Sequence, residues 1–188
     1  GLVRIIDKID FTNFKNNPKW VIGFSDVTVL HNHINSMNIA TLHAAMPNSY
    51  HSTPQVALDS IKEALFEPNY QLPNQFEGDE IVGGNLAIIY SLLGTNSDID
   101  TNGKILLLED IGEYAYNIDR MIFALKKAGK FEGIKGLLVG KFTDTKDDDF
   151  GFSVKEIIEN CTVEYSFPIF YDLPVGHVED NRAVVLGK

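Results

Sequence analysis

Ser25 lies at a predicted strand-turn-helix junction, where a hydroxyl could act as a nucleophile. The apolar residues 20–22 predict a short buried strand, Gly23 allows a sharp turn, and residues 26–30 predict the helix that follows. The free N–H groups and the positive dipole end of that helix would favour negative charge developing near Ser25. Ser25 could equally be an N-cap, because Val27 replaces the second glycine of the Gly-x-Ser-x-Gly elbow.

A serine nucleophile needs a base to take its proton, and His177 is the best placed of the five histidines. It ends the segment Leu-Pro-Val-Gly-His, which puts the imidazole on a loop beyond a strand, where α/β proteins gather functional groups. An exposed loop histidine is the alternative. His43 could line a site or lie in the core, and we expect surface or packing roles for His31 and His33. His51 lies in a polar loop in which the sequence indicates no partner for it.

The acid that would hold this base is expected directly after the apolar strand of residues 105–108. Glu109 and Asp110 come next in the chain, so that one carboxylate should point into a cleft while the other faces away. A carboxylate beside a buried strand is costly unless it is paired or hydrogen-bonded. Asp110 or Glu113 could instead cap the helix expected to begin near Asn117.

The composition of the 188 residues, with 44% hydrophobic and 22% charged, predicts a soluble α/β protein. A net charge of −10 argues against a nucleic-acid partner, which needs a basic face. The acidic residues 144–149 lack the glycine and terminal glutamate of a calcium loop, so we expect a solvated loop and no metal. The single cysteine, Cys161, predicts a small core residue, and no segment is long enough to cross a membrane.

The alternation of expected strands and helices predicts an open α/β architecture with parallel sheets and crossover connections. Residues 1–10 are expected to form a short helix and residues 12–17 a polar turn. A segment rich in proline and polar residues divides the chain into an N-terminal part, a linker and a C-terminal part, residues 1–70, 71–80 and 81–188. In the C-terminal part we expect helices at 86–93, 117–128 and 153–161 and strands at 104–108, 136–142, 169–171 and 182–186.

Four sequence blocks resemble, in this order, the LD-carboxypeptidases. They are Gly-Phe-Ser-Asp-Val-Thr (23–28), Val-Gly-Gly-Asn-Leu (82–86), Leu-Leu-Glu-Asp-Ile-Gly-Glu (107–113) followed by Ile-Asp-Arg-Met (118–121), and Pro-Val-Gly-His (174–177). The family consists of serine peptidases and includes murein tetrapeptide carboxypeptidases and microcin C immunity proteins. The likeness extends over nearly the whole chain.

The resemblance implies an open N-terminal α/β domain of the class I glutamine amidotransferase-like type, of which the chain holds part, and a C-terminal swivelling β/α domain. It also implies a catalytic triad, in which Ser25, Glu109 and His177 match the family's serine, glutamate and histidine. The N–H of Asp26 would donate to the oxyanion, and a second donor is expected from a glycine-rich turn whose last residue would be Gly1.

The activity implied by the resemblance is release of terminal D-alanine from an L,D bond in cytoplasmic muropeptides during cell-wall recycling. The implied enzyme needs no metal or cofactor and is a homodimer. One alternative is cleavage of a peptide-nucleotide amide, as in microcin immunity. The nucleobase of such a substrate calls for an aromatic side chain to stack on, and Trp20, in the strand before the elbow, is no obvious candidate. The other alternative is a non-catalytic relative.

The leaving D-alanine carries a carboxylate, which a guanidinium could hold with two hydrogen bonds. Arg120 shares the family's Asp-Arg block, although it could instead pair with Asp119 or Glu113; the other arginines are Arg4 and Arg182. Just past His177, Asp180 and Asn181 could contact substrate or orient the histidine.

Overall fold

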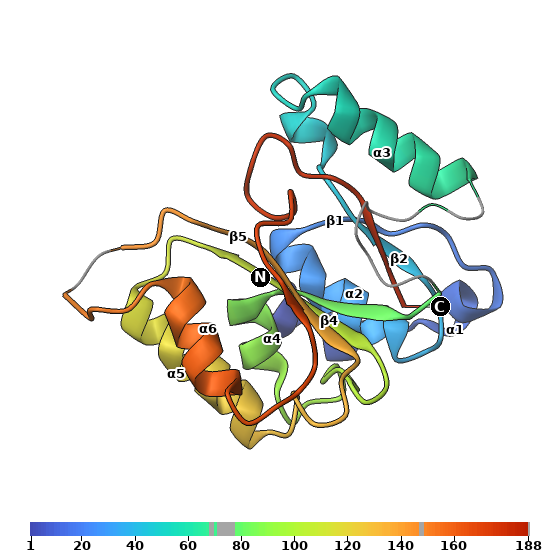
Figure 1. Cartoon of the computed structure of the whole chain (residues 1–188). Coiled ribbons are helices and arrows are strands. Elements are labelled where there is room, and N and C mark those ends of the chain that lie inside the picture. Colours follow the sequence, from blue (N-terminus) through green and yellow to red (C-terminus); the bar gives the residue numbers. More distant parts are fainter. Residues whose placement is uncertain (68–69, 71–77, 147–148, 188) are drawn as a thin grey trace.

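Two β-sheets and six α-helices make up the computed structural model, which describes residues 1–67, 70, 78–146 and 149–187 (Figure 1). The strands are β1 Ile22–Gly23, β2 Thr41–His43, β3 Ile81–Asn85, β4 Ile105–Ile111, β5 Gly136–Thr143, β6 Ile169–Phe170 and β7 Val184–Leu186. The helices are α1 Thr12–Asn16, α2 Thr28–Asn35, α3 Gln55–Phe66, α4 Leu86–Leu92, α5 Ala115–Lys127 and α6 Val154–Thr162. Short 3₁₀ turns are formed by Leu2–Arg4, Ile6–Lys8, Ser25–Val27 and Pro47–Ser49.

The first sheet has the strand order β1-β2-β7. β1 and β2 are parallel and are joined through α2, whereas β7 runs antiparallel to β2, with Thr41 opposite Leu186 and His43 opposite Val184. Figure 1 shows β7, in red, returning from the far end of the chain to lie beside β2. The first sheet is therefore completed by residues that lie more than a hundred positions later in the sequence.

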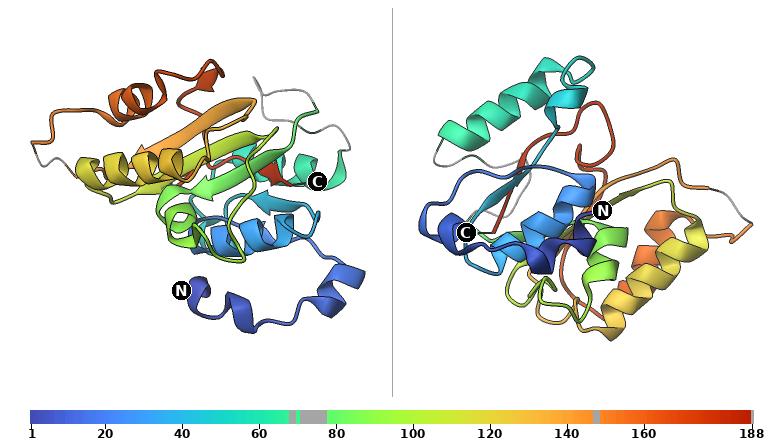
Figure 2. Two further views of the ribbon diagram at one scale, coloured as in Figure 1. Left: turned by 90° about the horizontal axis from the view of Figure 1, so that it is seen from below. Right: turned by 180° about the vertical axis from the view of Figure 1, so that it is seen from behind.

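The second sheet is fully parallel, with the order β3-β4-β5-β6. One face, which includes Leu106 and Leu108, packs in a single cluster with buried residues of α4, α5 and α6 (Figure 2). The opposite face, which includes Ile105 and Leu107, packs against Val175 and β7. Because side chains alternate between the faces of a strand, burial on both faces explains the continuous apolar run of residues 105–108.

Close backbone packing joins α2 to the second sheet at Gly84. A Cβ atom built on Gly84 would lie 2.7 Å from the Thr28 hydroxyl, and the backbone φ of Gly84 is +130°. The Thr28 hydroxyl accepts a hydrogen bond from the N–H of Asn85 at 3.2 Å. The helix that follows Ser25 is thus held against the end of β3.

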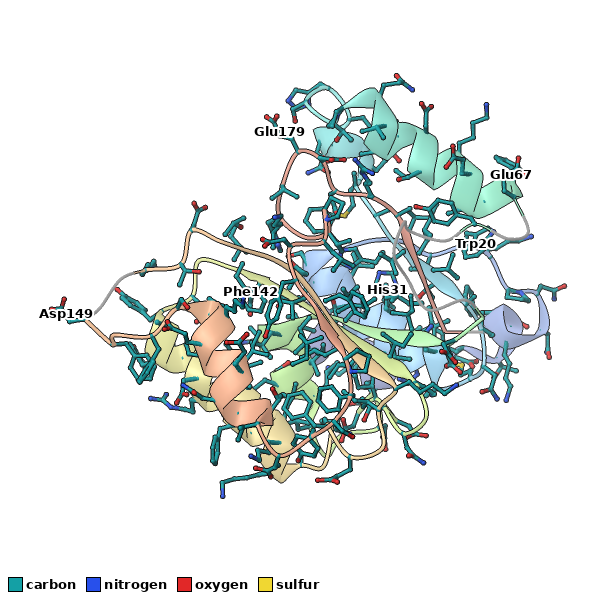
Figure 3. All side chains as sticks on the ribbon, viewed as in Figure 1. Trp20, His31, Glu67, Phe142, Asp149 and Glu179 are labelled. Atoms are coloured by element: carbon teal, nitrogen blue, oxygen red, sulfur yellow. The ribbon has the colours of Figure 1, made fainter. Side chains whose placement is uncertain are left out.

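Most of the elements expected from the sequence are present, and the differences lie mainly near the N-terminus. Residues 1–10 form two 3₁₀ turns instead of a helix, and residues 12–16 form α1 instead of a turn. The expected strand 20–22 is shifted to Ile22–Gly23, and Trp20, which precedes it, is 45% exposed instead of buried (Figure 3). Cys161 is buried on α6, as predicted.

The expected division of the chain at residues 71–80 stays a prediction, because residues 71–77 lie outside the described residues. β7, a strand of the expected C-terminal part, pairs with β2 of the expected N-terminal part, so the two parts share the first sheet. Within the described residues no cluster of three or more metal-ligating side chains is found, and residues 147–148 of the acidic loop lie outside them. In the same described part, none of the helices combines the length and apolar character of a membrane span.

Candidate active site

The turn that carries Ser25 has a strained backbone. Ser25 has a φ of +61°, which is uncommon for a residue other than glycine and persists only where the surroundings hold it. A Cβ on Gly23 would lie 2.9 Å from the Val27 side chain, so the turn needs glycine there. Within the described residues, the Ser25 side chain makes no hydrogen bond, and it caps no helix. Its hydroxyl is therefore available for chemistry.

Several hydrogen bonds fix the backbone on either side of Ser25. The buried His31 ring donates from Nε2 to the Gly23 carbonyl at 2.9 Å, and the N–H of Ala44 donates to the same oxygen at 3.1 Å. The Asp26 carboxylate accepts from the N–H of Leu2 at 2.8 Å. The N–H of Asp26 itself has no acceptor among the described residues, so that it is free to donate to an oxyanion.

Glu109 and His177 form a hydrogen-bonded pair at the C-terminal end of β4. His177 Nδ1 donates to Glu109 Oε2 at 2.9 Å, and the Glu109 side chain is fully buried. This bond places the proton on Nδ1 and leaves Nε2 as the free base, which is the tautomer that a serine nucleophile requires. The sequence separation of 68 residues shows that the loop after β6 folds back over the sheet.

Two glycines make the space that Glu109 occupies. A Cβ on Gly140 would lie 2.6 Å from the carbonyl oxygen of Val175 and 3.1 Å from Cβ of Glu109. A Cβ on Gly176 would lie 2.9 Å from Glu109 Oε2, the oxygen that binds His177. The glycine before His177 is thus needed for the hydrogen bond between Glu109 and His177 to form.

Replacement of Gly176 by alanine is expected to reduce any triad-dependent activity strongly. The new methyl group would push against the Glu109 carboxylate, and the φ of +126° is unfavourable for alanine. A displacement of about 1 Å can cost on the order of a hundredfold in rate. Steady-state kinetics of Gly176→Ala would check this, with Gly151→Ala as the control, because Gly151 also has a positive φ but no atom within 4 Å of an added Cβ. Equal activity in the two variants would contradict the expectation.

Phe24 links the Ser25 turn to the His177 loop. The Phe24 and His177 rings lie 4.8 Å apart between centroids, at an interplanar angle of 65°. Because Phe24 directly precedes Ser25, this contact puts His177 beside the elbow. Ser25 and His177 are not hydrogen-bonded to one another within the described residues, and such bonds are often long in free enzymes.

A pocket of about 290 Å³ opens beside Phe24 and His177. Its other lining residues come from the segment after β2 and from the loop after His177, namely Ala45, Ser49, Ser52, Thr53, Val178, Glu179 and Asn181. Residues 45–53 were not predicted as part of a site, although their run of short hydroxyl side chains could have suggested one. Phe24 belongs to the first family block, but an aromatic residue gives no signal of its own there.

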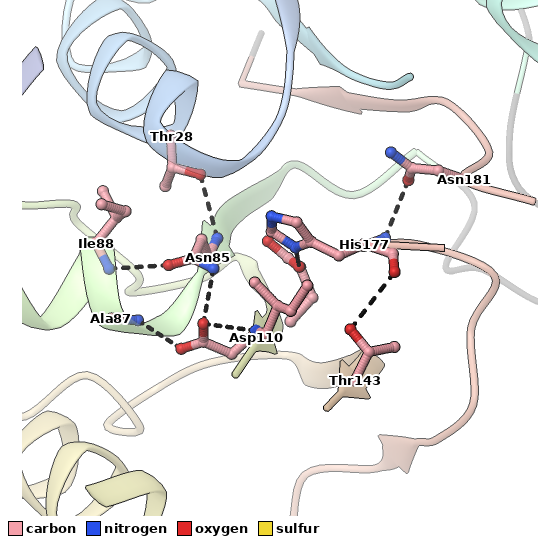
Figure 4. A network of polar contacts seen from close by, with 11 residues as sticks. Thr28, Asn85, Ala87, Ile88, Asp110, Thr143, His177 and Asn181 are labelled. Carbon is pink, nitrogen blue, oxygen red and sulfur yellow. Dashed lines mark hydrogen bonds and ion pairs between the residues drawn. The ribbon is translucent and has the colours of Figure 1, made fainter. Parts of the chain in front are cut away.

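Asp110 faces away from Glu109 and has a structural role. Its carboxylate accepts hydrogen bonds from the Asn85 side chain at 2.9 Å, from the N–H of Ala87 at 2.9 Å and from the N–H of Ile111 at 2.8 Å (Figure 4). Burial nevertheless raises the pKa of Asp110 above its ordinary value. Asp110 therefore supports the start of α4, and the expected cap of the later helix is wrong: α5 begins at Ala115 without any side-chain cap.

The predicted substrate-binding residues lie in different settings, and their role stays a prediction. Asn181 is buried in the pocket wall and accepts from the N–H of Gly176 at 3.0 Å, so it can orient the His177 loop. Asp180 pairs with the guanidinium of Arg182 through two contacts of 3.1 Å. Arg120 contacts Tyr116 and Asn117 on its own helix and does not line the pocket.

Two further histidines lie buried behind the site and are held neutral. The pKa of His43 is lowered to about 3, first by burial and then by the neighbouring His31 and His177 rings, while the Asn181 side chain acts in the opposite direction. Burial lowers the pKa of His31 to about 4, against the opposing effect of its bond to Gly23. Both rings serve as packed, uncharged supports of the elbow, as Figure 3 shows for His31 in the interior.

The stability of the fold is expected to fall as the pH drops below about 6.5. The unfolded chain binds protons at both histidines below their ordinary pKa of 6.5, whereas the folded chain resists protonation down to about 4 and 3. At pH 5 this amounts to roughly 2 kcal/mol for each histidine. Urea unfolding of His43→Gln between pH 8 and 5 should show a weaker pH dependence than the parent, and the exposed His51→Gln should not. An unchanged slope for His43→Gln would contradict the assignment.

Comparison with protein families gives two matches that together cover most of the chain. Residues 78–188 match the LD-carboxypeptidase C-terminal domain, and residues 1–44 match the LD-carboxypeptidase N-terminal domain. A probable murein peptide carboxypeptidase of Bacillus subtilis is 33% identical over 204 residues, which span all of this chain and 64% of that protein. The murein tetrapeptide carboxypeptidase of Pseudomonas aeruginosa is 27% identical over 190 residues, which cover 92% of this chain and 62% of that protein. The chain thus spans just under two thirds of the length of these relatives.

Solved structures share the same fold. The muramoyltetrapeptide carboxypeptidase of Oxalobacter formigenes superposes with a TM-score of 0.86 at 24% identity, over 98% of this chain and 68% of that one. The microcin C7 self immunity protein MccF, in complex with glutamyl sulfamoyl guanosine, superposes with a TM-score of 0.85 at 18% identity. The superposition covers 97% of this chain and 67% of that one. On the strength of the domain match over residues 78–188, the chain belongs to the LD-carboxypeptidase family.

Proposed function

We propose that this chain carries the catalytic triad of a serine carboxypeptidase that releases terminal D-alanine from murein tetrapeptides by hydrolysing an L,D-peptide bond. The observation that carries the proposal is the bond of 2.9 Å between His177 Nδ1 and the buried Glu109, next to a serine held at a φ of +61°. Family membership and the names of the murein peptide carboxypeptidases among the relatives support the choice of substrate.

The proposed reaction begins with attack of Ser25 Oγ on the carbonyl carbon of the L,D bond. His177 Nε2 takes the hydroxyl proton, while Glu109 holds the other ring nitrogen and stabilises the imidazolium that forms. The N–H of Asp26 donates to the oxyanion of the tetrahedral intermediate. His177 then gives its proton to the leaving nitrogen, so that D-alanine departs and an acyl group remains on Ser25. A water molecule, activated by His177, hydrolyses this ester and restores the serine.

The pocket beside His177 is the proposed place of the peptide. Its wall includes the hydroxyl side chains of Ser49, Ser52 and Thr53, and a pocket of about 290 Å³ suits a short peptide end better than a large ligand. The carboxylate of D-alanine requires a cation or a set of N–H donors. Whether Arg120 supplies it stays a prediction, as do action in the cytoplasm, assembly as a homodimer and chemistry without a cofactor.

Release of D-alanine by the full-length protein is the direct test. The protein would be incubated with a murein tetrapeptide ending in D-alanine, and free D-alanine would be measured over time. The same peptide ending in L-alanine is the matched control, because it differs only at one stereocentre and should not be cleaved. An aminoacyl sulfamoyl nucleotide tests the peptide-nucleotide alternative, and turnover of this compound alone would replace the murein assignment. No turnover of either substrate would favour a non-catalytic relative.

A further inference from the structure

The pocket of about 290 Å³ beside His177 has an acidic character. Among the described residues that line it, Glu179 is the one with an acidic side chain, and neither lysine nor arginine is present. The proposed mechanism uses His177 as a neutral base, so this ring adds no positive charge before the reaction begins. The charge of Glu179 therefore bears on which part of a murein tetrapeptide the pocket accepts.

Glu179 stands on a loop that is tied at both ends. The N–H of Val178 donates to the Gly176 carbonyl at 2.9 Å, and the N–H of Arg182 donates to the Pro174 carbonyl at 2.8 Å. Figure 3 shows Glu179 at the edge of this loop, toward the turn that precedes α3, whose residues line the same pocket. The backbone that carries Glu179 is thus held in place beside the pocket.

The Glu179 carboxylate is available to a ligand. Its side chain is exposed, and within the described part of the chain it makes no hydrogen bond or ion pair. The basic residue that follows it in the chain, Arg182, is bound to Asp180 through two contacts of 3.1 Å. Arg182 therefore leaves the charge of Glu179 uncompensated.

The hydroxyl groups of residues 49–53 meet a ligand as acceptors. The Ser49 hydroxyl donates its proton to the Met46 carbonyl at 2.9 Å. The Ser52 and Thr53 hydroxyls donate theirs to the Ser49 carbonyl, at 3.1 and 2.9 Å. A hydroxyl has a single proton, so the oxygens of these three side chains have only lone pairs left to offer. This wall therefore suits a group that is rich in donors and offers little to a carboxylate.

The apolar part of the lining comes from Phe24, Ala45 and Val178, against which an aliphatic chain can pack. The carboxylate of the leaving D-alanine would meet Glu179 and the hydroxyl oxygens, so it does not fit here. The residue before D-alanine in a murein tetrapeptide is a diamino acid, whose side chain is an aliphatic stem with an ammonium group at its end. The pocket matches this side chain in both parts.

We infer that the pocket selects a diamino acid whose side chain ends in an ammonium group alone, as in lysine. Diaminopimelic acid has the same stem and ammonium group but carries a second carboxylate beside it. That carboxylate would face the like charge of Glu179 and the acceptor oxygens, which lowers affinity. The inference rests on the proposed function and specifies its substrate class, with Glu179 as the residue that determines specificity.

Binding of two tetrapeptides to the full-length Ser25→Ala variant is the test. L-alanyl-γ-D-glutamyl-L-lysyl-D-alanine is compared with the peptide that has meso-diaminopimelic acid in place of lysine, so the two differ by one carboxylate. Titration calorimetry at low ionic strength should give a dissociation constant about tenfold lower for the lysine peptide. Salt at about 0.5 M should reduce this preference, because the charge of an exposed carboxylate is screened.

The outcome is distinguishable from a failure of the proposed function, because Ser25→Ala is used for binding and the parent for turnover. If the parent released no D-alanine from either peptide, the proposed function would fail, whereas a preference in binding would still support the specificity of the pocket. Equal affinity for the two peptides, or no binding of either, would overturn the inference.

Glu179→Gln, made in the Ser25→Ala protein, assigns the preference to this carboxylate. The exchange removes the charge with little change of shape, and the preference for the lysine peptide should fall to about threefold or less. Glu179→Lys should go further and favour the diaminopimelic acid peptide. Glu63→Gln is the matched control, because Glu63 is an exposed glutamate on α3 outside the pocket, and it should keep the parent's preference. An unchanged preference in Glu179→Gln would contradict the role of Glu179.

Discussion

Replacing Ser25 with alanine in the full-length protein is expected to lower kcat for D-alanine release by at least about a thousandfold and by up to about a millionfold. Loss of the nucleophile from a catalytic triad has effects of this order, since the acyl intermediate can no longer form. The substitution removes one hydroxyl that makes no side-chain hydrogen bond within the described residues, so stability should change little. Alanine does not favour a φ of +61°, but neither does serine.

The matched control for this change is Ser52→Ala. Ser52 lines the same pocket, and within the described residues its hydroxyl bonds to the Ser49 carbonyl at 3.1 Å, so its loss can weaken substrate binding but should leave kcat largely unchanged. Reaction with a serine-directed acylating probe, followed by mass spectrometry, gives an independent readout. Labelling at Ser25 is expected in the parent and in Ser52→Ala. Full turnover by Ser25→Ala would remove the serine mechanism altogether.

Glu109→Gln is expected to reduce kcat by on the order of ten-thousandfold while the protein stays folded. The glutamine amide would present either its NH₂ group or its oxygen to His177 Nδ1, at the position where the carboxylate now accepts the bond of 2.9 Å. The NH₂ orientation favours the tautomer with its proton on Nε2, which cannot take the serine proton. The loss of charge also leaves the imidazolium of the transition state without its partner.

Asp110→Asn provides the contrast to Glu109→Gln, since the two carboxylates are adjacent in β4. The new side-chain amide would bring an NH₂ group close to the N–H of Ala87 and the Asn85 amide, which now donate to the carboxylate. We therefore expect the unfolding free energy of this variant to be lower than that of the parent by about 1–3 kcal/mol, so that it unfolds at a lower urea concentration. Glu109→Gln should differ from the parent mainly in kcat. If the two variants lost activity and stability in parallel, the division of roles between the two carboxylates would be wrong.

Much of the second sheet could be predicted from the sequence because its signals are local. The uninterrupted apolar run of residues 105–108 requires burial on both faces, and the amphipathic pattern of residues 117–128 predicts α5. The order of the four family blocks led to the family itself, which the domain matches confirm. The N-terminal region was predicted less well, since α1 is only five residues long and two of its residues are asparagines, which are common in turns.

The site could be predicted only in part, because its parts meet across long stretches of chain. Local patterns indicated a hydroxyl at a turn and a histidine beyond a strand, but nothing local indicates that Phe24 packs on His177. The distinct roles of Glu109 and Asp110 follow from the side of β4 on which each lies, which depends on tertiary packing. The buried pair of His31 and His43 was undecided for the same reason, since burial depends on what covers a residue.

The return of β7 to β2 has a consequence for biosynthesis. During translation the ribosome releases β1 and β2 early, but their sheet lacks its third strand until residues 184–186 have emerged. The loop with His177 lies just upstream of β7, so the nascent polypeptide cannot anchor this loop at both ends before then. A newly made molecule therefore gains the proposed triad only after β7 has emerged, and a product terminated before β7 would carry Ser25 with no base fixed beside it.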